Sequence, residues 1–137
     1  MLDIKHIVQE ENTCTMACIA MAADMSYKEV KNAYPEFNGK GMTKRQTLQL
    51  LERLNIPNIP YTDATIFGGR LYLVAVPSLN IPGGMHTILL DYTSKEIIVI
   101  DPNKGYPGRA YYTNETLISW GEVIEFPLTI NTMQDDN

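Results

Sequence analysis

The sequence predicts an α+β fold in which N-terminal helices pack on a mostly antiparallel sheet. Two observations lead to this class. Helix signals fill roughly the first 54 residues, and the candidate strands all follow them. No repeat, low-complexity tract or flexible linker divides the 137 residues, and 45% of them are hydrophobic. We therefore expect one domain over residues 1–137, with a frayed polar tail at 132–137.

Three helices are expected before residue 55. The first begins at Thr13 or Thr15 and continues to about Met25, with small and apolar residues at helical spacing. The second and third each begin at a capping box, Ser26–Glu29 and Thr43–Gln46, in which two side chains bond each other's backbone N–H groups. The third helix carries an apolar stripe at three-residue spacing: Leu48, Leu51 and Leu54.

Strand signals begin after Pro57 and Pro60, which should end the third helix. Two of the apolar runs have apolar residues on both faces, which is typical of central strands covered on each side. The stretch 104–112, rich in glycine and tyrosine, should form a surface loop over one end of the sheet. The four expected strands are residues 71–76, 86–92, 96–101 and 123–126.

Composition excludes several classes of function. A formal net charge of −5 argues against a nucleic-acid partner, because phosphate binding depends on clustered Lys and Arg. No stretch is long and apolar enough for a bilayer, and no secretory signal is visible, so we expect a cytoplasmic protein without a membrane partner. The two cysteines, Cys14 and Cys18, do not form a disulfide framework and are interpreted as reduced thiols. Nothing in the sequence indicates the oligomeric state.

Cys14 lies at the start of the first expected helix, where the helix dipole favours a thiolate. His86 and Asp101 lie on the two strands of a predicted hairpin. If Tyr92 opposes Lys95 across the turn, His86 falls opposite Asp101 on the same face, with Cβ atoms about 5 Å apart. A carboxylate at that distance can accept one imidazole N–H and fix the tautomer of the ring.

Together these residues predict a nucleophilic catalytic site. Cys14 would attack a carbonyl group, His86 would carry the proton, and Asp101 would orient the imidazole. Gln9, just before the helix, would donate its amide N–H to the oxyanion, together with the backbone N–H of Cys14. Such a site requires no metal and no other cofactor. Cys18, one helical turn further on, is expected to be a core residue.

The combined pattern resembles the papain-like cysteine peptidases that process double-glycine leader peptides of bacteriocins. In that family a glutamine precedes the nucleophilic cysteine by five positions, a Gly-x-His segment heads a strand, and an Asp-Pro pair ends the next strand. Gln9, Cys14, His86 and Asp101-Pro102 match this pattern, and the resemblance covers roughly residues 7–126. It implies a papain-like fold and cleavage of a peptide or isopeptide bond in a peptide or protein substrate.

Other interpretations stay open. Family members usually carry an acidic residue before the cysteine and glycine after it, where this chain has Thr13 and Thr15. A deamidase or an acyl transferase would use the same triad. A papain-like module that has lost catalysis could instead bind a peptide or inhibit a partner. A zinc site is a third alternative, with two thiolates, an imidazole and a carboxylate as ligands: Cys14, Cys18, His86 and Asp101.

Overall fold

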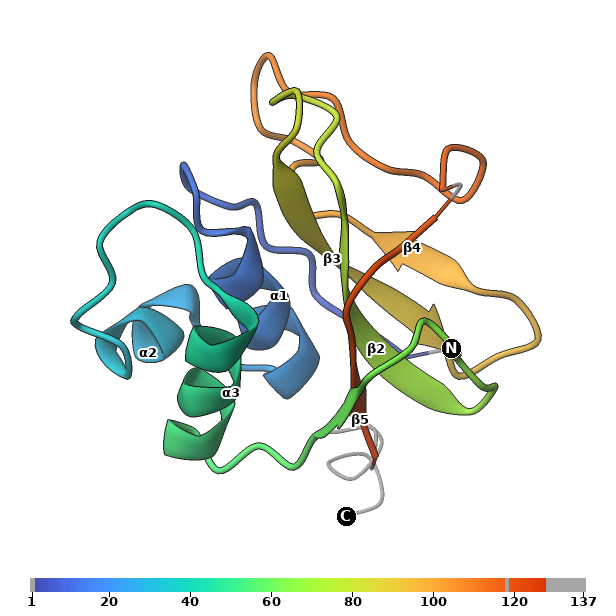
Figure 1. Cartoon of the computed structure of the whole chain (residues 1–137), viewed down its shortest axis with the longest axis horizontal. Helices are drawn as coiled ribbons and strands as arrows, with labels where there is room; N and C mark the ends of the chain where they lie inside the picture. The colour runs from blue at the N-terminus through green and yellow to red at the C-terminus, as the bar shows by residue number, and fades with distance from the viewer. Residues whose placement is uncertain (1, 118, 128–137) are drawn as a thin grey trace.

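The computed structural model describes residues 2–117 and 119–127 and has the expected α+β architecture (Figure 1). A layer of three helices lies against one face of a five-stranded sheet. The helices are α1 (Cys14–Ala23), α2 (Tyr27–Asn32) and α3 (Lys44–Arg53). The strands are β1 (Ile59–Tyr61), β2 (Arg70–Pro77), β3 (Met85–Tyr92), β4 (Ile98–Ile100) and β5 (Val123–Phe126). The tail at 132–137, which was expected to fray, lies outside the described residues.

Both expected capping boxes are present and set the starts of α2 and α3. The Ser26 hydroxyl accepts from the Glu29 N–H at 3.1 Å, and the Glu29 carboxylate accepts from the Ser26 N–H at 3.3 Å. The corresponding distances between Thr43 and Gln46 are 3.2 and 2.9 Å. These bonds satisfy backbone donors that the first turn of a helix leaves without partners. In the described part of the chain no helix is long and apolar enough to cross a membrane.

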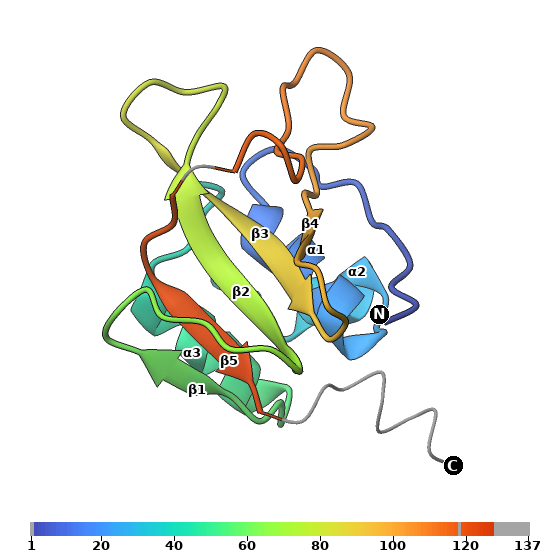
Figure 2. The same ribbon diagram turned by 90° about the vertical axis from the view of Figure 1, so that its right-hand side faces the viewer.

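The sheet has the strand order β1-β5-β2-β3-β4, and all of its neighbouring strands are antiparallel (Figure 2). β3 is an inner strand, as expected. The expectation that 96–101 is also central is wrong, because β4 forms an edge and spans only three residues. The sequence analysis missed β1, since Pro60 was interpreted only as a helix breaker. An edge strand tolerates proline because one side of its backbone needs no ladder partner.

The expected register of the β3–β4 hairpin is wrong by two residues. Leu90 opposes Val99, so the turn between the strands is longer than two residues. Asp91 is the cause: its carboxylate accepts bonds from the backbone N–H of Thr93 at 3.0 Å and from the Thr93 hydroxyl. Such an Asx turn bends the chain immediately after β3. A slip of two residues keeps every side chain on its expected face, so His86 and Asp101 still share one face.

Apolar residues cover both faces of the sheet. Helix α1 is buried on all sides, with nine of its ten residues buried, and it packs with α3 on one face. The expected stripe on α3 is partly wrong, because Leu48 and Leu54 are half-buried while Leu50 and Leu51 are fully buried. The second face carries a separate cluster of buried residues: Tyr72, Val74, Val76, Ile88, Leu90, Tyr112 and Val123.

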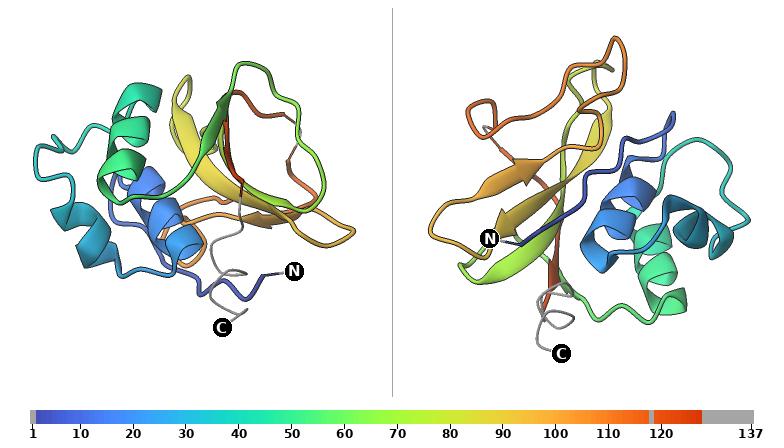
Figure 3. Two further views of the ribbon diagram at one scale, coloured as in Figure 1. Left: turned by 90° about the horizontal axis from the view of Figure 1, so that it is seen from below. Right: turned by 180° about the vertical axis from the view of Figure 1, so that it is seen from behind.

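Two long connections project from the same end of the sheet (Figure 2). One is the turn between β2 and β3, and the other is the loop after β4, which lies where the sequence predicted a surface loop. The Asn80 side chain ties them together, since it donates to the carbonyl of Ala110 at 2.9 Å and accepts from its N–H at 2.8 Å. Viewed from behind, the segment before α1 passes alongside β4 (Figure 3). The Gln9 N–H accordingly donates to the carbonyl of Pro102 at 2.9 Å.

Candidate active site

Cys14 is the first residue of α1 and is half-buried. Its position is fixed by the preceding turn, in which the Thr13 hydroxyl accepts from the Glu10 N–H at 2.9 Å and donates to the Glu10 carbonyl at 2.8 Å. Thr13 thus closes the turn between Gln9 and Cys14. The backbone N–H groups at the start of α1 and the helix dipole both favour negative charge at this thiol.

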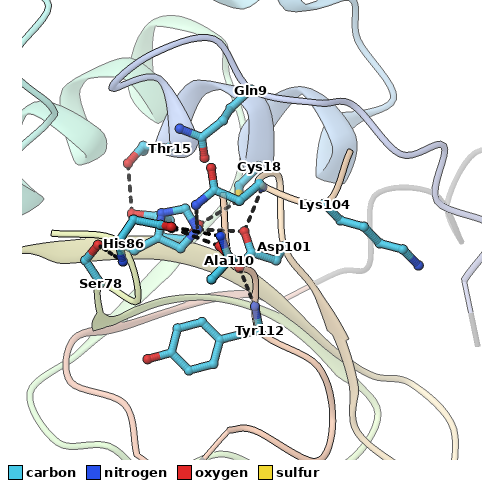
Figure 4. Close-up of polar contacts among 12 residues, drawn as sticks. Gln9, Thr15, Cys18, Ser78, His86, Asp101, Lys104, Ala110 and Tyr112 are labelled. Carbon is cyan, nitrogen blue, oxygen red and sulfur yellow. Dashed lines mark hydrogen bonds and ion pairs between the residues drawn. The ribbon is translucent and has the colours of Figure 1, made fainter. Parts of the chain in front are cut away.

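His86 and Asp101 form a buried pair (Figure 4). His86 Nε2 lies 2.6 Å from Asp101 Oδ1, and the two residues are 7% and 2% exposed. Because Nε2 is bonded to the carboxylate, Nδ1 is the ring nitrogen left to face Cys14. The sequence analysis therefore placed the imidazole and the carboxylate together correctly. In the observed register they are diagonal neighbours rather than directly opposed residues.

Backbone donors hold the Asp101 carboxylate in place. Oδ1 also accepts from the N–H of Asn103 at 2.8 Å, and Oδ2 accepts from the N–H of Tyr112 at 2.8 Å (Figure 4). These two bonds fix the orientation of the carboxylate relative to the His86 ring. Sequence reasoning missed both donors. Asn103 could have been found with the correct register, because extending the observed β3–β4 pairing beyond Leu89 places Asn103 opposite His86.

The pKa values of the cysteine and the histidine shift toward an ion pair. Burial would raise the pKa of Cys14, but its hydrogen bond to His86 and the charge of that residue outweigh burial, and the net pKa is lowered. Burial would lower the pKa of His86, but hydrogen bonds to Asp101 and Cys14 outweigh it and raise the pKa to about 9. Between the two pKa values, the stable form is a thiolate beside an imidazolium.

Thr87, the residue after His86, connects β3 to the start of α1. Its hydroxyl lies 3.0 Å from that of Thr15, and its hydrogen bonds contribute to the lowered pKa of Cys14. The thiol of Cys18 donates to the Thr87 carbonyl at 3.5 Å. Cys18 is fully buried and burial raises its pKa well above the usual value, so its expected place in the core is confirmed.

Gln9 lies close to the pair, and its side-chain amide bonds to the neighbouring backbone. It is 6% exposed, its Nε2 donates to the Glu10 carbonyl at 3.2 Å, and its Oε1 has no hydrogen-bond partner. A cleft of about 590 Å³ is lined by Cys14 and His86, whereas Gln9 and Asp101 lie outside its lining. The structure therefore brings three of the four expected site residues into contact, and Gln9 has a neighbouring position.

The cleft runs between the helical layer and the sheet. One wall is formed by residues 40–44 and the first turns of α3, and the other by β2 and the segment 121–124. Leu73 and Ile124 supply apolar surface, while Lys40, Lys44 and Glu122 bring charge to the lining. A cleft of this volume, with the thiol and the imidazole in its lining, is a candidate binding site.

The zinc alternative has no support in the geometry. Among residues 2–117 and 119–127, no group of three or more His, Cys, Asp and Glu side chains is arranged to hold a metal ion. Cys18, which that alternative requires as a thiolate, is bonded to a backbone carbonyl inside the core. The raised pKa of its thiol also opposes the deprotonation that a metal ligand needs.

Helices packed on an antiparallel sheet, with a cysteine at a helix start beside a strand-borne histidine, define a papain-like fold. Among solved structures, the chain is similar to the peptidase domain of Streptococcus ComA, a bi-functional ABC transporter involved in quorum sensing. The TM-score is 0.63 and the identity 15%, over 91% of this chain and 99% of that domain. This likeness confirms the expected papain-like fold. No family model and no curated protein matches the sequence.

Proposed function

We propose that this protein is a papain-like cysteine peptidase in which Cys14 is the nucleophile, His86 the acid and base, and Asp101 the residue that orients His86. The observation that carries the proposal is the buried His86–Asp101 pair at 2.6 Å beside a cysteine at the start of α1. The opposite pKa shifts of Cys14 and His86 support it, because a lowered thiol pKa and a raised imidazole pKa both favour the reactive thiolate. The proposed substrate is a peptide or protein segment that occupies the cleft.

In the proposed acylation step, the Cys14 thiolate attacks the scissile carbonyl carbon and forms a C–S bond. The carbonyl electron pair moves to oxygen, where the backbone N–H of Cys14 stabilises the oxyanion. Gln9 is the proposed second donor, and this role requires its Nε2 to exchange the Glu10 carbonyl for the oxyanion. His86 then gives its Nδ1 proton to the leaving amine as the C–N bond breaks.

The acyl-enzyme is then resolved by water. Neutral His86 removes a proton from the water molecule, the resulting hydroxide attacks the thioester, and Cys14 leaves as a thiolate beside the regenerated imidazolium. An acyl transferase would use an amine in place of water, and a deamidase would release ammonia in the first step. Both are variations on the same proposed chemistry.

Site-resolved alkylation tests the proposal. Iodoacetamide is applied between pH 5 and 9 to the wild type and to His86→Ala, and labelling of each cysteine is measured by mass spectrometry. We expect rapid labelling of Cys14 at pH 6, with Cys18 as the internal control that stays unlabelled. The rate at pH 6 should fall by about a hundredfold in His86→Ala, because an ordinary thiol is almost fully protonated at that pH.

The contrary result is slow labelling of both cysteines that rises only near the ordinary thiol pKa of about 8.5. That outcome would leave a papain-like module without an active thiol, and peptide binding would become the function to test. If Cys14 is reactive, a library of short peptides with fluorescent quenchers then identifies the preferred cleavage sequence. Cys14→Ala serves as the inactive control in that screen.

A further inference from the structure

Two buried amide oxygens near the catalytic pair have no hydrogen-bond partner. Among residues 2–117 and 119–127, three buried side-chain atoms lack a partner, and two of these are Gln9 Oε1 and Asn103 Oδ1. Asn103 is 4% exposed, so water does not readily replace the missing bond. A buried acceptor without a partner typically costs about 1–3 kcal/mol, which makes the placement of this amide significant.

The contact between Asn103 and His86 explains the unpartnered oxygen. Asn103 Nδ2 lies 3.5 Å from His86 Nε2, the nitrogen that bonds to Asp101 at 2.6 Å. Nε2 carries its proton toward the carboxylate and cannot also accept a bond from an amide. Two donors therefore face each other. The oxygen and the nitrogen of an amide group differ little in size, so an amide rotated by 180° fits the same space.

We propose that Asn103 is a positioning residue for His86, with its amide oxygen facing Nε2 and sharing the ring proton with Asp101. This inference rests on the proposed function, because it concerns the residue that acts as acid and base there. The rotation turns a contact between two donors into a hydrogen bond. It also moves Nδ2 to the place where Oδ1 lacked a partner. The backbone of Asn103 already donates to Asp101 at 2.8 Å, so one residue supports both members of the pair.

A second acceptor at Nε2 restricts the orientation of the His86 ring. A single bond at Nε2 leaves the imidazole free to pivot about that bond, whereas two acceptors on different sides of the N–H define the ring plane. The ring then keeps Nδ1 directed at Cys14. The titratable groups that face His86 are Cys14 from α1 and Asp101 from the end of β4. The uncharged amide of Asn103 adds a dipole to these charges, and an oxygen directed at Nε2 stabilises the imidazolium.

The sign of a pKa change tests this orientation. His86 is titrated by NMR through its ring carbon and nitrogen shifts in the wild type, Asn103→Leu, Asn103→Ala and Asn103→Asp. Loss of an acceptor in the first two variants should lower the pKa of His86, by about one unit or tenfold in proton affinity. A carboxylate in Asn103→Asp should raise it. Asn58→Leu, which changes an asparagine whose side chain donates to the Ile56 carbonyl, is the matched control.

If the pKa of His86 rises or stays unchanged in Asn103→Leu and Asn103→Ala, the inference is overturned. Removal of an amide N–H donor that faces His86 would raise this pKa, whereas removal of an acceptor lowers it. Neutron diffraction from wild-type crystals gives an answer without any variant. Deuterons on the Asn103 atom nearest His86 would overturn the inference, and deuterons on the far atom would support it. Slow alkylation of wild-type Cys14 at pH 6 would instead count against the proposed function, so the two failures are distinguishable.

Discussion

The Asp101 carboxylate connects His86 to the loop that follows β4. Its two oxygens receive the His86 ring N–H and the backbone N–H groups of Asn103 and Tyr112. The last two donors belong to the loop that follows β4. The charge that stabilises the imidazolium is therefore positioned by main-chain geometry. The same loop also supplies the Asn103 amide, so the conformation of this loop affects His86, the proposed base, in two ways.

Asp101→Asn should reduce the proposed activity strongly while the fold is kept. The uncharged amide no longer stabilises the imidazolium, so the pKa of His86 should fall from about 9 toward its ordinary value of 6.5. We expect kcat/KM to fall by about a hundredfold or more, since the ring also loses its fixed tautomer. Activity assays together with NMR titration of His86 measure both effects. The exposed variant Asp63→Asn is the control, and equal activity of Asp101→Asn and wild type would contradict the assigned role.

The pH dependence of kcat/KM should be bell-shaped. Activity rises as pH passes the lowered pKa of Cys14, where the thiolate forms, and falls as pH passes about 9, where His86 loses the proton that the leaving amine needs. An activated ester, whose leaving group needs no proton, should keep the acid limb and lose most of the alkaline limb. If the amide and ester substrates gave the same alkaline limb, His86 would not be the acid.

At the scale of elements, Asp91 determines the turn that sets the register beside the site. Its carboxylate is 1% exposed, bonds to Thr93 and also accepts from the N–H of Leu2 at 3.0 Å. Asp91→Ala should lower the free energy of unfolding by roughly 2–3 kcal/mol, because buried donors lose their partner. Urea denaturation measures the change. Lys95→Ala, an exposed position in the same turn, should shift stability by less than about 0.5 kcal/mol, and an equal loss in both variants would contradict this account.

The same turn shows how far the sequence could predict this site. Helix starts were predictable because capping boxes act within four residues, and the common face of His86 and Asp101 was predictable because side chains alternate along a strand. The length of the β3–β4 turn was not predictable from the pattern. It depends on the hydrogen bonds between the Asp91 carboxylate and Thr93, and the pattern shows Asp91 only as a strand residue. That error of two residues concealed Asn103. The backbone donor of Tyr112 depends on the course of a long loop, for which no local pattern exists.

At the scale of the whole molecule, the sheet separates two apolar clusters, and adjacent residues of β3 test both. Leu89 faces the helices and Ile88 faces the second cluster, and both are fully buried. Leu89→Ala and Ile88→Ala should each lower the free energy of unfolding by about 2–5 kcal/mol. Ile59→Ala, at an exposed position on the edge strand β1, is the control. A loss below about 1 kcal/mol for Ile88→Ala would mean that the second face is not a cooperative core.

The complete burial of α1 has a consequence for how the protein loses activity on heating. Nine of its ten residues are buried, so unfolding this helix would expose a large part of the core. Its interior amides should therefore exchange with deuterium only through global opening. Cys14, the proposed nucleophile, begins this buried helix, whereas the Asp101 partner of His86 is held by backbone donors from the loop after β4. Thermal inactivation that precedes unfolding would accordingly begin with the loops around Asp101 and leave the thiol in its native place.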